Sequence, residues 1–333
     1  MLPNSRLEVH FLNVDHGDCT IIRHPGDDHR SKGRVSFIDI NDWKEREEEV
    51  ASFSSFVSDA IGYKSQISPE EYARRYLNDP IEYFEEQVAE GGQGVWRFVS
   101  THPDMDHLSG LSRLVSTHDF SVLWDIDHNK SLSQGDSWPP QCEYEDWEIY
   151  SDIRNNNTDH QALQPTRGAE QKYWKEDNID ILHPSPSFVR EINEDNEGRK
   201  QDVYNDISYV LKLNTRAGAV LLPGDAENDA WEEILQHHGE EVLSDVRILK
   251  AAHHGRKDGF HNEAVSAMDP EYVIVSVGKK DSADAYEDYY RVCSDDTEII
   301  STRQYGSITA IISKRGAMTV TKEVPDGIFD LPN

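Results

Sequence analysis

The sequence predicts an α/β fold, a four-layer αββα sandwich formed by one domain over residues 1–333. Apolar, β-branched runs near the N-terminus predict strands, alternating helix and strand patterns follow in the second half, and strand patterns return at the end. This order suits two sheets packed face to face with helices on their outer sides. Two polar stretches, residues 42–95 and 128–203, are expected to interrupt the pattern as insertions.

In the N-terminal part, strands are expected at residues 7–14, 19–23 and 35–40, since these runs are rich in β-branched and aromatic residues between Gly, Pro and Asp. Residues 42–95 are charged, show helical spacing and end in a Gly-rich run, which predicts a helical insertion. A strand at residues 96–100 leads into a loop rich in His and Asp. A helix at 108–117 and a strand at 120–126 are expected next.

The C-terminal part begins with residues 128–203, which are polar and are interpreted as an insertion or a lid, with one strand-like piece at 179–182. Further strands are expected at residues 207–213, 219–222, 246–249 and 273–277, and a helix at 228–238. Residues 307–320 predict a hairpin. The polar loops that follow several of these strands are therefore candidates for one shared site.

The composition excludes several classes of protein. The chain has 36% hydrophobic and 29% charged residues, a net charge of -30, and no run near the roughly 18 apolar residues of a spanning helix. The N-terminus lacks a signal-peptide pattern, so a cytoplasmic protein without membrane contact is expected. Three widely separated cysteines do not predict a thiolate zinc site or a disulfide framework. Such an acidic surface repels long nucleic acids, except where bound metals reverse the local charge.

The strongest chemical motif is the loop at residues 101–110, directly after an apolar strand. It holds His102, Asp104, Asp106 and His107 within six positions. Imidazole nitrogens and carboxylate oxygens together form a ligand set for zinc, manganese or iron. Four such residues in one loop predict a metal site.

A second motif delivers one carboxylate at the end of another strand. Asp225 follows the apolar run 219–222 and Gly224, where the backbone can turn sharply. An Asp at this place is also a common helix N-cap, and Asp225 precedes the helix expected at 228–238. The presence of the first motif favours the metal interpretation.

A third motif is the pair His253 and His254, followed by Gly255, after the strand at 246–249. A similar pair, His237 and His238, ends the expected helix instead, where a histidine suits the helix dipole. The position after a strand favours His253 and His254 as the functional pair, and which of the two is a ligand stays open.

Together, these motifs resemble the metallo-β-lactamase superfamily, and within it the hydrolase domain of the competence protein ComEC. The order is strand-H-x-x-x-D-H, strand-G-D and strand-H-H-G. Residues 102–107 are similar to the "HPDxDH" form of that group, 205–208 to its "ND-x-S", 221–225 to its "LLxGD" and 252–255 to its "HHG". The turn at 13–18 resembles its "DVGQGD" with departures. The resemblance implies a metallo-β-lactamase sandwich and covers residues 6–280 without the insertions.

Two departures affect the expected metal site. Asp104 stands where the superfamily usually has the second His of H-x-H-x-D-H, and an oxygen ligand there favours manganese or iron. The separate His of the superfamily's middle motif has no clear counterpart, and His128 and His160 are the candidates. One of the metal positions is therefore expected to be weak.

The resemblance also implies roles for individual residues around two divalent metal ions, zinc or manganese. His102 and Asp104 hold the first ion, Asp106 and His107 the second, Asp225 bridges them, and His254 or His253 completes the set. The ions activate water, which Asp106 orients. The other histidine of the pair, Arg256 or Lys257, stabilises the developing charge. Asp15, His16 and Asp18 either orient the ligands or simply close a turn.

The expected function is hydrolysis of a phosphodiester, DNA or a nucleotide, by a phosphodiesterase or nuclease. The acidic surface lacks the basic footprint of a protein that binds nucleic acid alone, so a protein partner that presents the substrate is expected. Three alternatives stay open: a hydrolase of small nucleotides, an ester or lactone hydrolase of the same fold, and a non-catalytic subunit of a larger complex such as a defence module.

Overall fold

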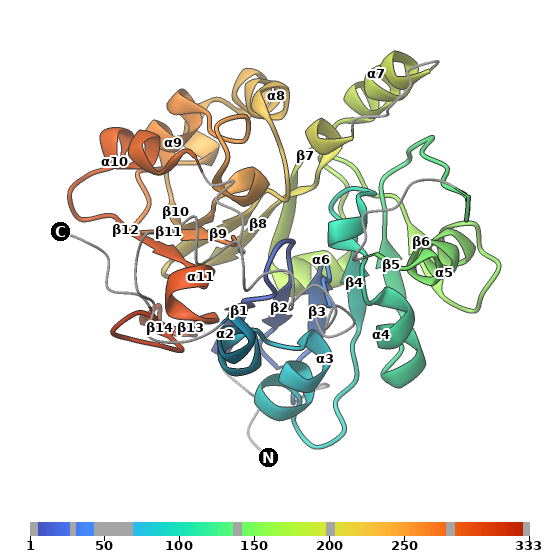
Figure 1. Ribbon diagram of the computed structural model, residues 1–333. Helices are drawn as coiled ribbons and strands as arrows, with labels where there is room; N and C mark the ends of the chain where they lie inside the picture. The colour runs from blue at the N-terminus through green and yellow to red at the C-terminus, as the bar shows by residue number, and fades with distance from the viewer. Residues whose placement is uncertain are drawn as a thin grey trace.

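Two β-sheets form the centre of the protein (Figure 1). The computed structural model describes residues 6–26, 31–42, 69–135, 142–197, 204–277 and 284–328. The strands of the larger sheet are β1 (Arg6–Phe11), β2 (Thr20–Arg23), β3 (Val35–Ile38), β4 (Arg97–Val99), β5 (Val122–Trp124), β6 (Gln161–Leu163), β13 (Ile308–Ser313) and β14 (Met318–Lys322). The strands of the smaller sheet are β7 (Ile179–His183), β8 (Val210–Thr215), β9 (Gly218–Leu222), β10 (Val246–Lys250), β11 (Tyr272–Val275) and β12 (Glu298–Ser301).

The order of strands differs from the chain order in both sheets. The 8-stranded sheet has the order β14-β13-β1-β2-β3-β4-β5-β6, and the 6-stranded sheet has the order β12-β11-β10-β9-β8-β7. Strands β3, β4, β5 and β6 pair in parallel, as do β9, β10, β11 and β12. Loops that leave neighbouring parallel strands emerge at one edge of the sheet, which brings their side chains together.

Helices connect the strands of the two sheets. They are α2 (Pro69–Tyr76), α3 (Pro80–Tyr83), α4 (Leu111–Thr117), α5 (Tyr144–Arg154), α6 (Lys172–Asp177), α7 (Pro186–Asn196), α8 (Asn228–His238), α9 (Asn262–Met268), α10 (Tyr286–Val292) and α11 (Thr302–Tyr305). A π-helical turn, η2 (Phe84–Val88), extends α3, and 3₁₀ turns lie at η3 (Met105–His107), η4 (Asn205–Ile207), η5 (Glu240–Val242) and η6 (Ala252–Gly255). Among the described residues, no helix combines the length and apolar character needed to cross a membrane.

Three apolar clusters show that the fold has four layers. The first lies between the two sheets and includes Val9 of β1 and Val220 of β9. The second joins the outer face of the larger sheet to α3, α4 and α5, and the third joins the outer face of the smaller sheet to α8, α9 and α10. Side chains alternate between faces along a strand, so Val220 faces the other sheet while Leu221 faces the helices. The predicted four-layer αββα sandwich is confirmed.

The polar stretch 128–203 contributes to both sheets. Strand β6 pairs with β5 at the edge of the larger sheet, and β7 pairs with β8 at the edge of the smaller one. Helix α5 precedes β6, α6 lies between β6 and β7, and α7 follows β7. Figure 1 shows α7 projecting from the body of the protein. The expected insertion at 42–95 is described only from residue 69, where it forms α2, α3 and η2. Residues 43–68 lie outside the described residues.

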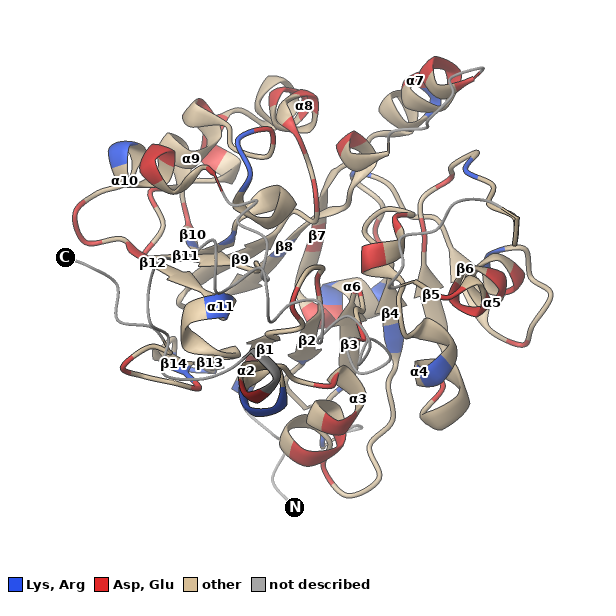
Figure 2. Ribbon diagram, in the orientation of Figure 1, with Lys and Arg blue, Asp and Glu red and all other residues tan. Residues whose placement is uncertain are grey.

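The expected helix at 108–117 begins later in the structure. Helix α4 starts at Leu111 because Gly110, with a φ of 98°, takes a left-handed conformation that interrupts the helical backbone. The preceding residues form η3, so the loop with the His and Asp residues turns tightly before the helix. Acidic residues occur on the outer helices, as Figure 2 shows for α3, α5 and α8.

Candidate metal centre

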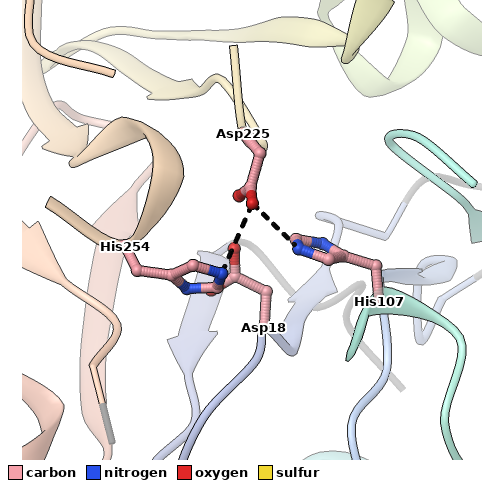
Figure 3. Close-up of side chains that lie close together, drawn as sticks. All are labelled: Asp18, His107, Asp225 and His254. Atoms are coloured by element: carbon pink, nitrogen blue, oxygen red, sulfur yellow. Dashed lines mark ion pairs between the residues drawn. The ribbon is translucent and has the colours of Figure 1, made fainter. Parts of the chain in front are cut away.

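Four buried side chains from four segments of the chain meet at one end of the sandwich (Figure 3). Asp18 precedes β2, His107 ends η3, Asp225 follows β9 and His254 lies in η6 after β10. One ligand atom from each of these residues lies within 4.8 Å of the others. The structure therefore brings together the three motifs that the sequence places after strands, and adds Asp18 to them.

Asp225 lies at the centre of this cluster. Its Oδ2 atom is 3.4 Å from Nε2 of His107 and 3.4 Å from Nε2 of His254. Its backbone N–H donates to Oγ of Ser208, over 3.2 Å, so the "ND-x-S" segment holds the Gly-Asp turn in place. A Cβ atom on Gly224 would lie 2.8 Å from the side chain of Thr101, and this close approach requires glycine.

The orientation of each imidazole is set by its other nitrogen. Nδ1–H of His107 donates to Oδ2 of Asp39 over 2.8 Å, and Nδ1–H of His254 donates to the carbonyl of Ser276 over 3.2 Å. Both Nε2 atoms then face Asp225 and, like Nε2 of His102, are buried without a hydrogen-bond partner among the described residues. Buried nitrogens with this arrangement fit metal ligands, whose second nitrogen is typically held by a carboxylate or a carbonyl.

The electrostatics of the cluster favour ionised carboxylates. Burial opposes the charge of Asp225, but His254 and His107 hold the pKa of that carboxyl well below its ordinary value. Burial likewise lowers the pKa of His254, yet Asp225, Asp18 and Asp106 together raise it to about 10. A divalent cation would compete with these protons for the same nitrogens.

The pair His253 and His254 takes an unusual backbone conformation that separates the two rings. Their φ values are 47° and 55°, in the left-handed region that non-glycine residues rarely adopt. Such strain, on the order of 1–3 kcal/mol per residue, is often found at functional sites. This backbone conformation directs the His254 ring toward Asp225 and the His253 ring toward Glu227 and Asp258.

His253 is predicted to be catalytic, and the structure places it at the rim of the cluster. Its Nε2 is 3.7 Å from Oδ2 of Asp225. Its Nδ1 lies 3.2 Å from Oε1 of Glu227 and 3.0 Å from Oδ1 of Asp258. Although burial lowers the pKa of His253, Glu227 and the neighbouring carboxylates raise it above its ordinary value. The imidazole is thus held between two acidic side chains.

The other predicted residues of the first motif lie beside the cluster. The ring of His102 is 4.2 Å from that of His107, and its Nε2 is 3.7 Å from Oδ2 of Asp104. Asp104 is more open, with 36% of its side chain exposed, and its Oδ1 lies 2.5 Å from Nζ of Lys130. Oδ2 of Asp106 lies 3.7 Å from Nε2 of His254. Despite burial, His107 and His254 lower the pKa of Asp106.

Lys257, also predicted to be catalytic, is exposed on the loop after η6. Its backbone N–H donates to Oδ1 of Asp284 over 2.7 Å, which fixes the loop and leaves the ammonium group on the surface. The neighbouring Arg256 pairs with Asp258 over 3.4 Å. The structure therefore places Lys257 near the end of the sandwich that carries the cluster, but not in it.

Two candidates for the missing middle-motif ligand lie elsewhere. Nε2 of His128 is 2.9 Å from the hydroxyl of Tyr150, and its Nδ1 accepts from the backbone N–H of Lys130. Nε2 of His160 lies 2.5 Å from Asp119. Both histidines have their hydrogen-bond partners, and neither belongs to the cluster of four.

Sequence reasoning missed Asp39 and Lys250. Asp39 follows β3, and it orients His107 from the neighbouring parallel strand. Lys250 ends β10, is buried, and forms an ion pair with Asp18, whose carboxylate it neutralises. Both could have been predicted from the sequence, because each is a charged residue at the carboxyl end of an otherwise apolar strand.

The chain resembles a solved structure and a curated protein. No protein-family model matches the chain. A similar solved structure is Igni18, described as a novel metallo hydrolase from the archaeon Ignicoccus hospitalis. The two sequences are 11% identical, and the alignment covers 94% of this chain and 98% of that chain with a TM-score of 0.43. Competence protein ComA of Neisseria gonorrhoeae is 28% identical over 110 residues, which are 33% of this chain and 14% of ComA. The predicted resemblance to competence proteins is confirmed. The matched segment spans only a small part of ComA.

Proposed function

We propose that the protein is a metal-dependent hydrolase that cleaves phosphodiester bonds, as a phosphodiesterase or nuclease. The observation that carries this proposal is the convergence of buried, unpartnered imidazole nitrogens on Asp225. His107, Asp225 and His254 would hold a divalent ion, zinc or manganese, and His102 and Asp104 would contribute to a second position. Bound there, such ions would activate water and polarise a phosphoryl oxygen.

The residues around the cluster support this chemistry. Asp106 lies at the mouth of the cluster, with 26% of its side chain exposed, and its ionised carboxylate can accept a hydrogen bond from the attacking water. His253, held by Glu227 and Asp258 at the rim of the cluster, would hydrogen-bond the substrate where negative charge develops. Lys257, exposed on the following loop, can contact a neighbouring phosphate.

The choice of a phosphodiester rests on the similarity to competence proteins and on the motifs of the ComEC-like group. The net charge of -30 does not favour binding to long DNA without help. A protein partner that presents DNA or a nucleotide to the metal centre would reconcile the two observations. An ester or lactone substrate is the alternative that the same ligand set would also serve.

The test is hydrolysis by protein that has been stripped of metal and reloaded with manganese or zinc. The substrates are bis(4-nitrophenyl) phosphate, labelled single-stranded and duplex DNA, and 4-nitrophenyl acetate as the ester. Wild-type protein is compared with Asp106→Ala, His107→Ala and His254→Ala, and with His237→Ala as the matched control, because His237 lies exposed at the end of α8.

Turnover of a phosphodiester by wild-type protein and His237→Ala, but not by the three site variants, would support the proposal. Turnover of the acetate ester alone would replace the phosphodiester with an ester substrate. Equal turnover by all variants, or a wild-type protein that binds no divalent ion, would overturn the proposed site.

A further inference from the structure

We propose that the two halves of the metal centre bind divalent ions with unequal affinity, and that Lys130 weakens the half formed by His102 and Asp104. This inference rests on the proposed metal-dependent function. It identifies a residue of the chain that controls metal occupancy, outside the three motifs that supply the ligands.

The stronger half contains His107, Asp225 and His254. These side chains are almost completely buried, and the two Nε2 atoms lie 3.4 Å from the same carboxylate oxygen. Among the described residues, Asp225 forms ion pairs only with histidines. A divalent ion at these three residues therefore meets the Asp225 carboxylate without a competing lysine or arginine, whereas Lys250 pairs with Asp18, the fourth residue of the cluster.

The weaker half lacks such a set. Within the described part of the chain, two groups of three or more ligand side chains have atoms within 4.8 Å of one another, and neither includes His102 or Asp104. Instead, Nζ of Lys130 lies 2.5 Å from Oδ1 of Asp104. Only 14% of the Lys130 side chain is exposed, so the lysine is largely packed against the protein.

The position of Lys130 is built into the fold. Its backbone N–H donates to Nδ1 of His128 over 3.1 Å, and Nε2–H of His128 donates to the hydroxyl of Tyr150 on α5 over 2.9 Å. The adjacent backbone N–H of Asn129 donates to Oδ1 of Asn193 on α7. His128, considered above as a metal ligand, thus anchors the loop that delivers Lys130.

An ammonium group on Asp104 opposes metal binding in two ways. It neutralises the carboxylate that a divalent ion needs, and it repels that ion at short distance. A metal bound at His102 and Asp104 must displace Lys130 or tolerate its charge. Removal of the lysine charge is expected to tighten this position.

The test measures metal content and affinity without any substrate. Stripped protein is loaded with excess zinc, passed through a metal-free desalting column and analysed by mass spectrometry for zinc per chain, beside calorimetric titration. We expect wild-type protein to retain one ion and Lys130→Met to retain two, with the second ion bound at least about tenfold more tightly than in wild-type protein. Lys322→Met is the matched control, because Lys322 on β14 also pairs with a carboxylate, that of Glu298, and this variant should retain one ion.

Two further variants identify the position of each ion. Asp104→Asn should keep the single tight ion at wild-type affinity, whereas His254→Ala should lose it, and thermal unfolding verifies that each variant is folded. Two equally tight ions in wild-type protein, or identical binding by Lys130→Met and wild-type protein, would overturn the role of Lys130 and leave the proposed function standing. Loss of the tight ion from Asp104→Asn would overturn the assignment of the two halves. No ion in the wild-type protein would instead overturn the proposed function.

Discussion

The carboxylate of Asp39 binds His107 and the loop that carries it at the same time. Oδ2 of Asp39 accepts from Nδ1–H of His107 over 2.8 Å and from Oγ1–H of Thr101 over 2.7 Å, and Oδ1 accepts from the backbone N–H of Thr101 over 2.8 Å. This arrangement selects the tautomer of His107 that leaves Nε2 free to face Asp225.

Asp39→Asn is expected to weaken zinc binding by roughly 10–100-fold without unfolding the protein, because an amide cannot accept from all three donors. A competition assay with a chromophoric chelator measures the affinity. The matched control is Asp119→Asn, an exposed aspartate that pairs with His160 away from the site. Equal affinities for both variants would show that Asp39 does not orient a ligand.

Gly224→Ala is expected to lower the free energy of unfolding by about 1–3 kcal/mol in chelated protein and to reduce zinc affinity. The residue has a φ of 55°, and an added Cβ would lie 2.8 Å from Thr101 next to Asp225. Gly92→Ala is the control that separates backbone strain from steric overlap of the added Cβ atom. Gly92 has a φ of 78°, but no atom lies within 4 Å of the added Cβ. Denaturant titration of both variants should show the larger loss at Gly224, and similar losses would contradict the packing argument.

Asp177→Ala is expected to destabilise the fold by about 3–5 kcal/mol, because it leaves the buried guanidinium of Arg97 without its carboxylate. Arg34 loses the same partner. Glu176→Ala is the control, since Glu176 also pairs with Arg34 but is 35% exposed, and its removal should cost less than about 1 kcal/mol. Urea unfolding curves of the two variants provide the comparison, and similar losses would argue against a buried charge network.

His24 is expected to make stability depend on pH. Burial lowers the pKa of His24 to about 4, below its ordinary value of 6.5, so the unfolded chain binds more protons between these two values. The contribution of neutral His24 to the free energy of unfolding is therefore fully present above pH 6.5 and decreases as the pH falls toward 4. At pH 5 this loss amounts to about 2 kcal/mol. His24→Gln should reduce the difference between unfolding free energies at pH 7 and pH 5, whereas His237→Gln should leave it unchanged. A variant that keeps the full wild-type difference would assign the pH dependence to other groups.

Local patterns in the sequence were enough to predict the layers of the fold and most of the ligand candidates. The helix expected at residues 228–238 is observed as α8, and the predicted strand at 219–222 lies within β9, since each pattern is set by neighbouring residues in the chain. His107 and Asp225 are predicted as candidates because each comes after an apolar strand, β4 of the larger sheet and β9 of the smaller one. Their contact arises from the packing of the two sheets.

Only the tertiary structure distinguished His254 from His253, which are adjacent and chemically identical. The left-handed backbone at both residues directs His254 toward Asp225 and Asp18, and His253 toward Glu227 and Asp258. Likewise, no local pattern pairs Asp39 with His107 or Lys130 with Asp104, because these partners come from segments far apart in the chain. A sequence determines which chemical groups are present near each strand, whereas the distances between groups on different strands arise only when the sheets and loops pack together.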